Sequence, residues 1–395
     1  MTVPVRAIAA LSLAAGVSGM ALRVADPMLP RLAQDFGTSL GQVAQVVTAF
    51  AVAYGLAQLV FGPLGDRFGK FRVIAWACGA SALTSLACAL APGLAGLTAA
   101  RLAAGATAAA VIPLSMAWIG DVVPYAQRQP VLARFLIGQI TGMALGMWLG
   151  GFAAEHLDWR TPFLALAAAF GLLALGLVQV QRRVPAAGAR PAPSAARPRL
   201  RAEFGAVLAL PWARVVLATV FLEGAALFGA FPFVAAHLHQ RFGVSLATAG
   251  GLMVGFAAGG LLFALGARWW VARLGERWLV TAGGATVAAM LVVVALAPAW
   301  GWTPPAFVAM GLGFYMLHNT LQTQATQMAP ERRGAAVAAF AGCFFLGQSA
   351  GAAAGGALVG RVGTAALLAG AGVAVLGVAL QFNHRRRHHT VAAAA

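Results

Sequence analysis

Charged residues are scarce in this sequence, and acidic residues are the scarcest. Asp, Glu, Lys and Arg make up only 9% of the 395 residues, and just 10 residues are Asp or Glu. Typical soluble domains carry about 25% charged residues, so the composition excludes an ordinary soluble fold. The hydrophobic content of 61% and the mean hydropathy of +0.83 predict instead a chain that lies mostly within a lipid bilayer.

Neither the cysteines nor any sequence motif points to a disulfide framework, a metal site or an enzyme. The three cysteines, Cys78, Cys88 and Cys343, lie inside apolar segments and predict neither a disulfide framework nor a metal site. No phosphate-binding loop, G-x-S-x-G or H-E-x-x-H motif occurs, so we expect no enzyme activity, no use of ATP and no bound cofactor. The net charge of +17 is dispersed at the ends of apolar runs, which argues against a nucleic-acid partner.

Apolar segments recur along the whole chain, each close to the length of about 20 residues that crosses a bilayer. The first follows Arg6 and continues without a convincing cleavage site, so we interpret it as an uncleaved helix. The predicted spans are 6–30, 42–63, 73–91, 95–120, 132–153, 161–181, 212–236, 247–267, 279–297, 304–328, 335–356 and 363–382. The sequence therefore predicts an all-α integral membrane protein with twelve transmembrane helices.

Basic residues orient these helices. If both termini are cytoplasmic, 21 of the 27 Lys and Arg residues fall on the inner side. The outer side then holds Arg31, Arg101, Arg160, Arg241 and Arg361. This asymmetry fits the positive-inside rule. We expect a multi-pass protein of the inner (plasma) membrane with both termini cytoplasmic and with Arg31–Gln42 and Arg241–Leu246 outside.

One change of composition divides the chain into two related halves. Residues 182–205 are rich in Pro, Ala and Arg without a helical period, which predicts a flexible cytoplasmic linker. The predicted domains are an N-terminal six-helix bundle (1–181), the linker (182–211) and a C-terminal six-helix bundle with a cytoplasmic tail (212–395). Phe36-Gly-Thr-Ser-Leu40 matches Phe242-Gly-Val-Ser-Leu246, and Gly138-Gln-x-x-Gly142 matches Gly347-Gln-x-x-Gly351. Such repeats predict pseudo-symmetric bundles with a substrate site between them.

The turn between the second and third spans, residues 62–73, reads G-P-L-G-D-R-F-G-K-F-R-V. Its glycines permit a tight turn, and the Asp66 carboxylate can accept hydrogen bonds from helix N-terminal amides. The stretch resembles the loop between helices 2 and 3 of major facilitator superfamily transporters, G-x-L-x-D-R-x-G-R-K, although Phe71 replaces the second basic residue. The resemblance implies a cytoplasmic gating motif formed by Gly62, Gly65, Asp66, Arg67, Gly69, Lys70 and Arg72.

Two further motifs extend this resemblance. Residues Gly142, Gly146, Gly150 and Gly151 approximate the G-x-x-x-G-P-x-x-G-G pattern of superfamily antiporters, with Met147 in place of the proline. Small residues at this spacing let another helix approach closely, so plain helix packing is the alternative. The stretch Arg101-Leu-Ala-Ala-Gly105 is similar to an R-x-x-x-G motif that the family links to proton coupling.

Ionisable residues inside the spans are few and unevenly distributed. A charge at the bilayer centre costs roughly 2.5–3.5 kcal/mol, so such residues are usually functional or paired. They are Arg23, Asp26, Arg101, Glu223 and His318, on the first, fourth, seventh and tenth spans. The resemblance implies that these four helices line a central cavity, whereas the third, sixth, ninth and twelfth face outward.

We assign Glu223 to proton coupling, because burial away from a cation favours the protonated carboxyl group. Asp26, Arg101 and Arg23 are assigned to support it, and the substrate cavity is assigned to Tyr54, Tyr315, His318 and Gln322. Simpler interpretations stay open at this point. The two charges of the first span can neutralise each other, Arg101 can extend outward to the membrane surface, and His318 can serve interhelical hydrogen bonding.

The resemblance implies a secondary active transporter that works by alternating access as a monomer. We expect proton-coupled efflux of small amphipathic compounds such as drugs, sugars or metabolites, with the proton gradient as energy source and the bilayer, protons and cargo as partners. Uptake by proton symport is an open alternative. A non-transporting membrane sensor or scaffold is a second one.

Overall fold

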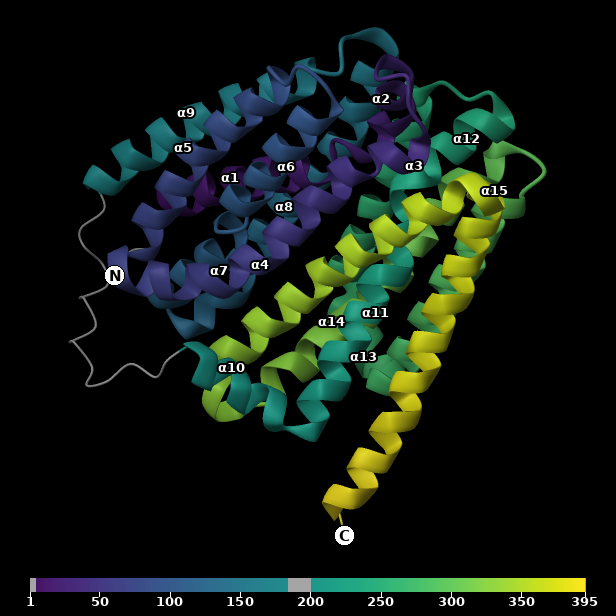
Figure 1. The fold of residues 1–395 in the computed structure, drawn as a ribbon. Coiled ribbons are helices and arrows are strands. Elements are labelled where there is room, and N and C mark those ends of the chain that lie inside the picture. The colour runs from purple at the N-terminus through teal and green to yellow at the C-terminus, as the bar shows by residue number, and fades with distance from the viewer. Residues whose placement is uncertain (1–4, 184–199, 395) are drawn as a thin grey trace.

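Helices make up all the regular structure of the residues that the structure describes. The computed structural model describes residues 5–183 and 200–394, and within these ranges it contains no β-strand. The first half, purple to teal in Figure 1, contains α1 (Val5–Arg23), η1 (Asp26–Met28), α2 (Leu29–Asp35), α3 (Leu40–Val43), α4 (Gln45–Phe68), α5 (Lys70–Ala89), α6 (Leu94–Ala108), α7 (Val111–Val122), α8 (Tyr125–His156) and α9 (Thr161–Arg183).

The second half, teal to yellow in Figure 1, has fewer and longer helices. It contains α10 (Leu200–Ala209), α11 (Pro211–Ala230), η2 (Phe231–Phe233), α12 (Val234–Phe242), α13 (Leu246–Leu296), η3 (Trp300–Trp302), α14 (Thr303–Gln327), η4 (Pro330–Arg332) and α15 (Arg333–Ala394). Helices α13 and α15 turn back at Gly275 (φ 67°) and Gly363 (φ 78°). Glycine adopts positive φ without steric cost, so each of these elements comprises two helices joined at the glycine.

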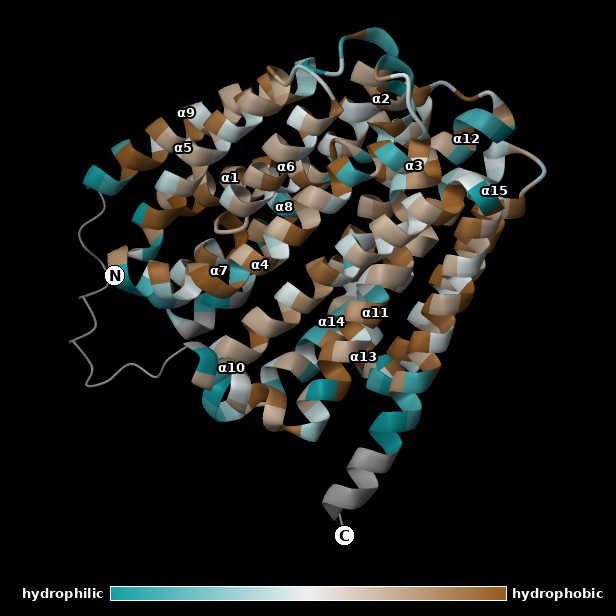
Figure 2. Cartoon of the chain, in the orientation of Figure 1, coloured by the Kyte–Doolittle hydropathy of each residue, from teal (hydrophilic) through white to brown (hydrophobic). Residues whose placement is uncertain are grey.

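All twelve predicted spans fall on helices. Among the described residues, nine helical segments are long and apolar enough to cross a membrane, and brown residues cover most of their length in Figure 2. Two of these nine segments contain α13 and α15, which each hold two predicted spans. Helix α14 is outside the nine, and its second half is the polar run at 318–327. The fold is an all-α membrane bundle, as the sequence predicts.

The predicted spans 6–30 and 212–236 are among those that are interrupted rather than continuous. Each contains a short 3₁₀ turn, η1 with Pro27 and η2 with Pro232. A proline lacks the backbone N–H and clashes with the carbonyl four residues earlier, so it breaks an α-helix. The two breaks lie at matching positions of the internal repeat, and the first one places Asp26 at the start of η1.

The predicted linker is partly helical, which corrects the expectation of an irregular segment over 182–205. Residues 184–199 lie outside the described residues, but 200–205 belong to α10. Phe204 and Val207, three positions apart on one face, pack on the core of the second half. Glu203 of α10 also pairs with Arg332 of η4, with 3.6 Å between Oε1 and Nε. Helix α10 therefore belongs to the second half of the bundle.

Each half has its own hydrophobic core. One core draws mainly on α1–α9 and the other mainly on α10–α15, and the two groups of helices lie side by side in Figure 1. Within each half a glycine stripe packs one helix against the first membrane-spanning helix of that half. The stripes are Gly142 and Gly146 of α8, against α1, with Gly150 against Val24 just after α1, and Gly347, Gly351 and Gly355 of α15, against α11.

The two halves meet closely at one end of the bundle. We name the end formed by α2, α3 and α12 the Asp35 end, and the end with the α4–α5 turn and α10 the Asp66 end (Figure 1). At the Asp35 end, α8 lies so close to α13 that a Cβ on Gly151 would come 2.9 Å from Gly250 Cα. There the Glu155 carboxylate accepts a hydrogen bond of 2.9 Å from the Leu246 amide at the start of α13.

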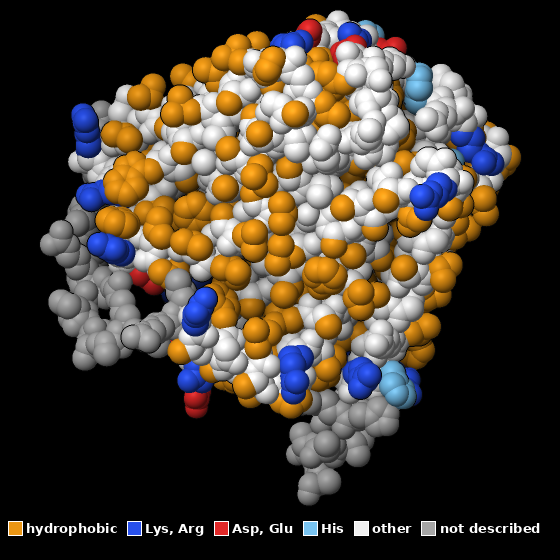
Figure 3. All heavy atoms as spheres, in the orientation of Figure 1, with side chains coloured by type: hydrophobic (Ala, Val, Ile, Leu, Met, Phe, Trp, Pro, Cys, Tyr) orange, Lys and Arg blue, Asp and Glu red, His pale blue; other side chains and the backbone are white. Residues whose placement is uncertain are grey.

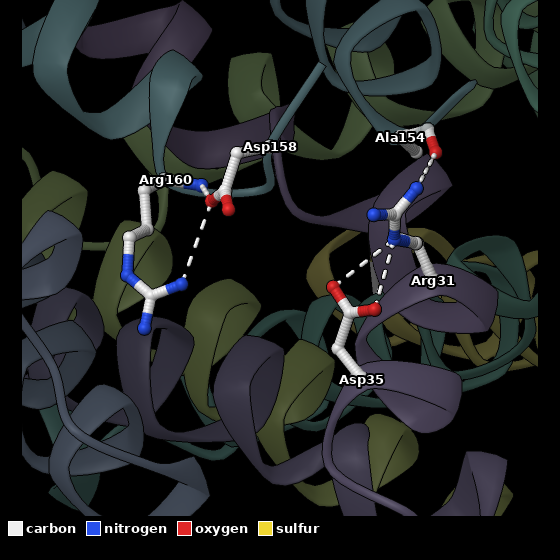
Figure 4. Close-up of polar contacts among 5 residues, drawn as sticks. All are labelled: Arg31, Asp35, Ala154, Asp158 and Arg160. Carbon is white, nitrogen blue, oxygen red and sulfur yellow. Dashed lines mark hydrogen bonds and ion pairs between the residues drawn. The ribbon is translucent and has the colours of Figure 1, made fainter. Parts of the chain in front are cut away.

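Basic side chains at the Asp35 end are tied to nearby acceptors. Arg31 Nε donates to the Asp35 carboxylate at 3.0 Å, and Arg31 Nη1 donates to the Ala154 carbonyl at 3.3 Å (Figure 4). Arg160 pairs with Asp158 at 3.6 Å. On the face drawn in Figure 3, Lys and Arg side chains also gather along the lower rim, near the Asp66 end. The charge asymmetry seen in the sequence is thus an asymmetry between the two ends.

Candidate functional site

A buried acid–base pair lies between α11 and α14. His318 Nδ1 is 2.9 Å from Glu223 Oε2, and the two side chains are 15% and 1% exposed. The second carboxylate oxygen, Oε1, is buried and has no hydrogen-bond partner among the described residues. The pair can hold one proton on either side chain, and Oε1 is left for a further donor. The sequence assigned Glu223 and His318 to different roles, whereas the structure brings them together.

Aromatic rings surround this pair. The His318 ring stacks on Phe314 with 5.0 Å between centroids, and Phe344 and Phe340 lie at 4.5 and 5.4 Å. Phe228 of α11 contacts Phe344 at 5.7 Å and Phe314 at 5.3 Å. We name Phe228, Phe314, Phe340 and Phe344 the aromatic shell. It presents ring faces and edges to the pair, surfaces that suit apolar and cationic groups.

A second polar cluster joins the two halves of the bundle. Arg23 Nη1 lies 3.4 Å from Asp26 Oδ2, and Arg23 Nη2 donates to Gln348 Oε1 of α15 at 3.1 Å. The Arg23 guanidinium also lies 4.0 Å from the centre of the Phe228 ring. Phe228 therefore connects this cluster to the other rings of the aromatic shell.

Three polar atoms of this cluster have no hydrogen-bond partner among the described residues. Arg23 Nε, Asp26 Oδ1 and Gln348 Nε2 are buried and unpaired among the described residues, although their side chains are at most 3% exposed. Mutual neutralisation of Arg23 and Asp26 does occur, but it leaves these hydrogen-bonding groups unsatisfied, which is costly without a ligand or water. Gln348 was missed as a site residue. The sequence feature that could have identified Gln348 is the internal repeat, which aligns Gly347-Gln348 with Gly138-Gln139.

Arg101 is buried inside the first half and does not reach the membrane surface, which corrects one interpretation of its position. It is 1% exposed, and its guanidinium donates to the Ala21 carbonyl at 3.1 Å and to the Val46 carbonyl at 3.4 Å. It also lies 4.0 Å from the centre of the Phe50 ring. Arg101 interacts electrostatically with Asp26, whereas no contact joins it to Glu223 among the described residues.

The predicted cavity residues do not form one group. Tyr54 of α4 contacts Phe345 of α15 across the halves, with 4.4 Å between ring centroids. Tyr315 packs edge-on against Phe314 at 5.2 Å and interacts electrostatically with Arg23. Gln322 is exposed. His318, as described above, belongs to the acid–base pair.

The gating motif forms the α4–α5 turn at the Asp66 end. Gly69 adopts φ 93° between the two helices, and Lys70 lies 3.7 Å from Asp66 and 2.6 Å from Asp121 of α7. Gly65 packs on α7, where a Cβ would come 2.7 Å from Leu114 Cδ2. The remaining residues have looser surroundings: Gly62 faces open space, Arg67 lies 5.0 Å from the Phe68 ring, and Arg72 is exposed.

Asp66 makes no hydrogen bond or ion pair with the start of α15 among the described residues. The family resemblance implies such a contact, near Gly334–Ala336, when the Asp66 end is closed. We therefore expect Asp66→Asn to favour the conformation with a closed Asp35 end and to leave folding intact. A carboxylate at a helix N-terminus contributes roughly 0.3–1 kcal/mol, which corresponds to a population shift of about twofold to fivefold.

Spin-label distances measured across the Asp66 end, with and without Asp66→Asn, check this expectation. Glu331→Gln is the matched control, because Glu331 lies at the same end and is 91% exposed. Unchanged distance distributions in Asp66→Asn would show that Asp66 does not stabilise the closed Asp66 end.

Comparisons with known proteins agree with this geometry. The family model described as Major Facilitator Superfamily matches residues 11–352 and 216–394. The chain is 30% identical over 229 residues to the uncharacterized MFS-type transporter YceJ of Bacillus subtilis, a match that covers 58% of this chain and 57% of YceJ. It is 31% identical over 154 residues to the multidrug export protein EmrB of Escherichia coli, covering 39% of this chain and 30% of EmrB.

The matched parts thus span little more than half of these curated relatives, or less. Solved structures match over more of their length. A bacterial homologue of the human lysosomal transporter Spinster, in an inward-facing and occupied conformation, gives a TM-score of 0.78 at 17% identity over 98% of each chain. The nucleoside transporter NupG gives a TM-score of 0.73 at 14% identity over 97% of this chain and 98% of its own. The fold, the repeat and the family match lead to one conclusion: this chain belongs to the major facilitator superfamily of membrane transporters.

Proposed function

We propose that this transporter is a proton-coupled exporter of small amphipathic cations and that the Glu223–His318 pair carries the coupled proton. The observation that carries the proposal is the 2.9 Å contact between these side chains, with Glu223 Oε1 buried and unpartnered among the described residues. Intramembrane ionisable groups of this kind are costly and are usually functional.

The pair offers a simple exchange of proton for cargo. When the carboxyl group is protonated, the site is neutral apart from any charge on His318, and a cation gains little by binding. When Glu223 loses its proton, the carboxylate in a low-dielectric site attracts a cation strongly. Proton and cationic cargo then compete for one carboxylate, which is sufficient for antiport.

The aromatic shell supports the choice of cargo. Three of its four phenylalanine rings contact His318, and aromatic faces attract cations and apolar groups together. EmrB is a multidrug export protein, and another relative, 32% identical over 158 residues, is the methylenomycin A resistance protein of Streptomyces coelicolor. These names favour export of small organic compounds over uptake.

Alternating access is supported by the asymmetry between the two ends. The halves are in close contact at the Asp35 end through the glycine approaches and the Glu155–Leu246 hydrogen bond. We propose that the Asp35 end faces the outside of the cell and is closed in this conformation. Similarity to a Spinster homologue in an inward-facing conformation is consistent with that assignment.

The orientation yields a labelling prediction. A cysteine at Ser194, in a background without Cys78, Cys88 and Cys343, is expected to react with a membrane-impermeant maleimide only from the cytoplasmic side. Ser194 lies outside the described residues, and the expectation rests on the basic residues around it. A second cysteine at Asp158, in the loop at the Asp35 end, is the control and should react from outside. The reverse pattern would overturn the orientation.

Transport in proteoliposomes tests the proposed function. With an imposed pH gradient, the purified protein should drive accumulation of an amphipathic cation such as tetraphenylphosphonium into vesicles with an acidic lumen. Accumulation that requires the opposite gradient would favour the uptake symporter. Absence of transport for a broad panel of cations, anions and neutral compounds would favour a sensor or scaffold.

A further inference from the structure

A basic cavity lies at the Asp66 end, away from the acid–base pair. It has a volume of about 340 Å³ and lies between the second helix of α13 and the C-terminal part of α15. Its lining residues are Arg277, Trp278, Thr281, Leu380, Asn383, His384 and Arg387. Neither the gating motif nor the proposed transport site uses these residues. In Figure 3 basic side chains and a histidine gather around the lower end of α15.

Asn383 gives the cavity a fixed hydrogen-bond acceptor. Its Nδ2 donates to the Arg277 carbonyl at 3.0 Å and to Thr281 Oγ1 at 2.6 Å. A carbonyl oxygen can only accept, so the amide nitrogen must face Arg277 and Oδ1 must point elsewhere. Asn383 is 6% exposed, and its Oδ1 is buried without a partner among the described residues. A ligand with a hydroxyl donor would satisfy this atom.

Two arginines supply the positive charge. Among the described residues, no carboxylate forms an ion pair with Arg277 or Arg387, whereas the neighbouring Arg386 pairs with Glu276. Glu276 in turn accepts a hydrogen bond of 2.9 Å from Gln324 of α14. Glu276, the acid adjacent to Arg277 in sequence, is therefore already engaged. A guanidinium binds phosphate oxygens with good geometry, so the cavity suits a phosphate group.

The position of the cavity points to a lipid. Arg277 and Trp278 lie just before the predicted span 279–297, and Asn383 and Arg387 lie just after the predicted span 363–382, so the cavity is at a membrane boundary. Trp278 is 60% exposed and Leu380 is 51% exposed. Tryptophan is enriched at the headgroup level of membranes, and an exposed leucine beside it offers a surface for acyl chains.

We propose that this cavity binds the headgroup of an anionic phospholipid that carries a free hydroxyl, as phosphatidylglycerol does. The phosphate lies between Arg277 and Arg387, and the headgroup hydroxyl donates to Asn383 Oδ1. The acyl chains follow Trp278 and Leu380 toward the bilayer. A lipid bound in this way bridges α13 and α15 at the end of the bundle where the second helix of α13 begins its membrane crossing and α15 ends its own.

Native mass spectrometry of the full chain in detergent tests the proposal. Dioleoyl phosphatidylglycerol and dioleoyl phosphatidylethanolamine are added to wild type, to Arg277→Gln/Arg387→Gln and to Arg268→Gln. The control Arg268 is exposed on the same half and does not line the cavity. A basic residue near an anionic lipid is worth about 1 kcal/mol. Loss of both arginines should therefore weaken phosphatidylglycerol binding about tenfold to thirtyfold, with wild-type binding in Arg268→Gln.

Each alternative result has a defined meaning. Equal retention of phosphatidylglycerol and phosphatidylethanolamine by wild type would overturn the proposal, as would wild-type binding in the double variant. Inorganic phosphate and soluble glycerophosphoglycerol form the second arm, measured as thermal stabilisation. If either one stabilises the protein as strongly as phosphatidylglycerol does, the cavity is a site for a soluble phosphate compound and the assignment to lipid is wrong.

Discussion

Glu223→Gln is expected to abolish transport driven by a pH gradient and to bind the cationic cargo weakly at every pH, as the protonated wild-type site does. The amide has the shape of the protonated carboxyl group but cannot release a proton, so no carboxylate forms to attract the cation and no proton is exchanged for it. Allosteric coupling energies of 1–3 kcal/mol correspond to about 5–150-fold changes in affinity. The pH dependence of cargo affinity in wild type should lie in this range and should disappear in Glu223→Gln.

Two further variants make this experiment discriminating. Asp158→Asn removes a carboxylate that is 57% exposed at the Asp35 end and should transport like wild type. Asp26→Asn removes the acid that is paired with Arg23. If Asp26→Asn loses gradient-driven transport while Glu223→Gln transports normally, the coupled proton belongs to η1 and the role of the Glu223–His318 pair is wrong.

Gly142→Ala is expected to destabilise the first half of the bundle. A Cβ at this position would overlap the backbone of Gly16 on α1, and backbone atoms cannot move aside as a flexible side chain can. Overpacking of a tight core costs typically about 1–3 kcal/mol. Unfolding titrations with sodium dodecyl sulfate should therefore show a loss of stability of this order, with reduced yield of folded protein.

Gly176→Ala is the matched control for this prediction. Gly176 lies in α9, and a Cβ there would meet nothing within 4 Å. Because alanine has the higher helix propensity by about 1 kcal/mol in water, the control should be neutral or slightly stabilising. Equal stability of the two variants would mean that α1 and α8 are not in the close contact described above.

The membrane fold could be predicted because a bilayer permits a chain very few backbone conformations. Backbone groups must be satisfied inside each span, so twelve apolar runs could only become helices, and glycines such as Gly69 marked a turn between two of them. The breaks at Pro27 and Pro232 were visible as residues but were not predicted, because prolines in membrane helices are often tolerated when neighbouring groups satisfy the freed backbone.

The candidate site was only partly predictable, because its partners are far apart in sequence. Glu223 and His318 are separated by 95 positions, and Arg23 and Gln348 by 325. The rarity of ionisable residues in the apolar spans drew attention to them as a set, but no pattern within one helix predicts which residue of another helix it will face. Gln348, a neutral residue in an apolar helix, carried no charge signal, and only the repeat pointed to it.

The amphipathic helix α10 was missed for a different reason. Its apolar residues Phe204 and Val207 follow a Pro- and Arg-rich stretch, and the composition of that stretch dominated the interpretation of 182–205. The helix is stabilised by tertiary contacts, with Val207 fully buried and Glu203 paired with Arg332. Short helices of this length are marginal without such contacts, so local sequence alone gave too little signal.

The most direct test of the central claim is a count of protons released when cargo binds. Tetraphenylphosphonium has no titratable group, so any proton released on binding comes from the protein. Calorimetric titrations in two buffers of different ionisation enthalpy give this number for wild type and for Glu223→Gln. The proposed exchange predicts release of up to about one proton per bound cation from wild type, approaching one at pH values where the free site is protonated, and none from Glu223→Gln. Binding without proton release by wild type across the pH range, or equal release by both proteins, would contradict it.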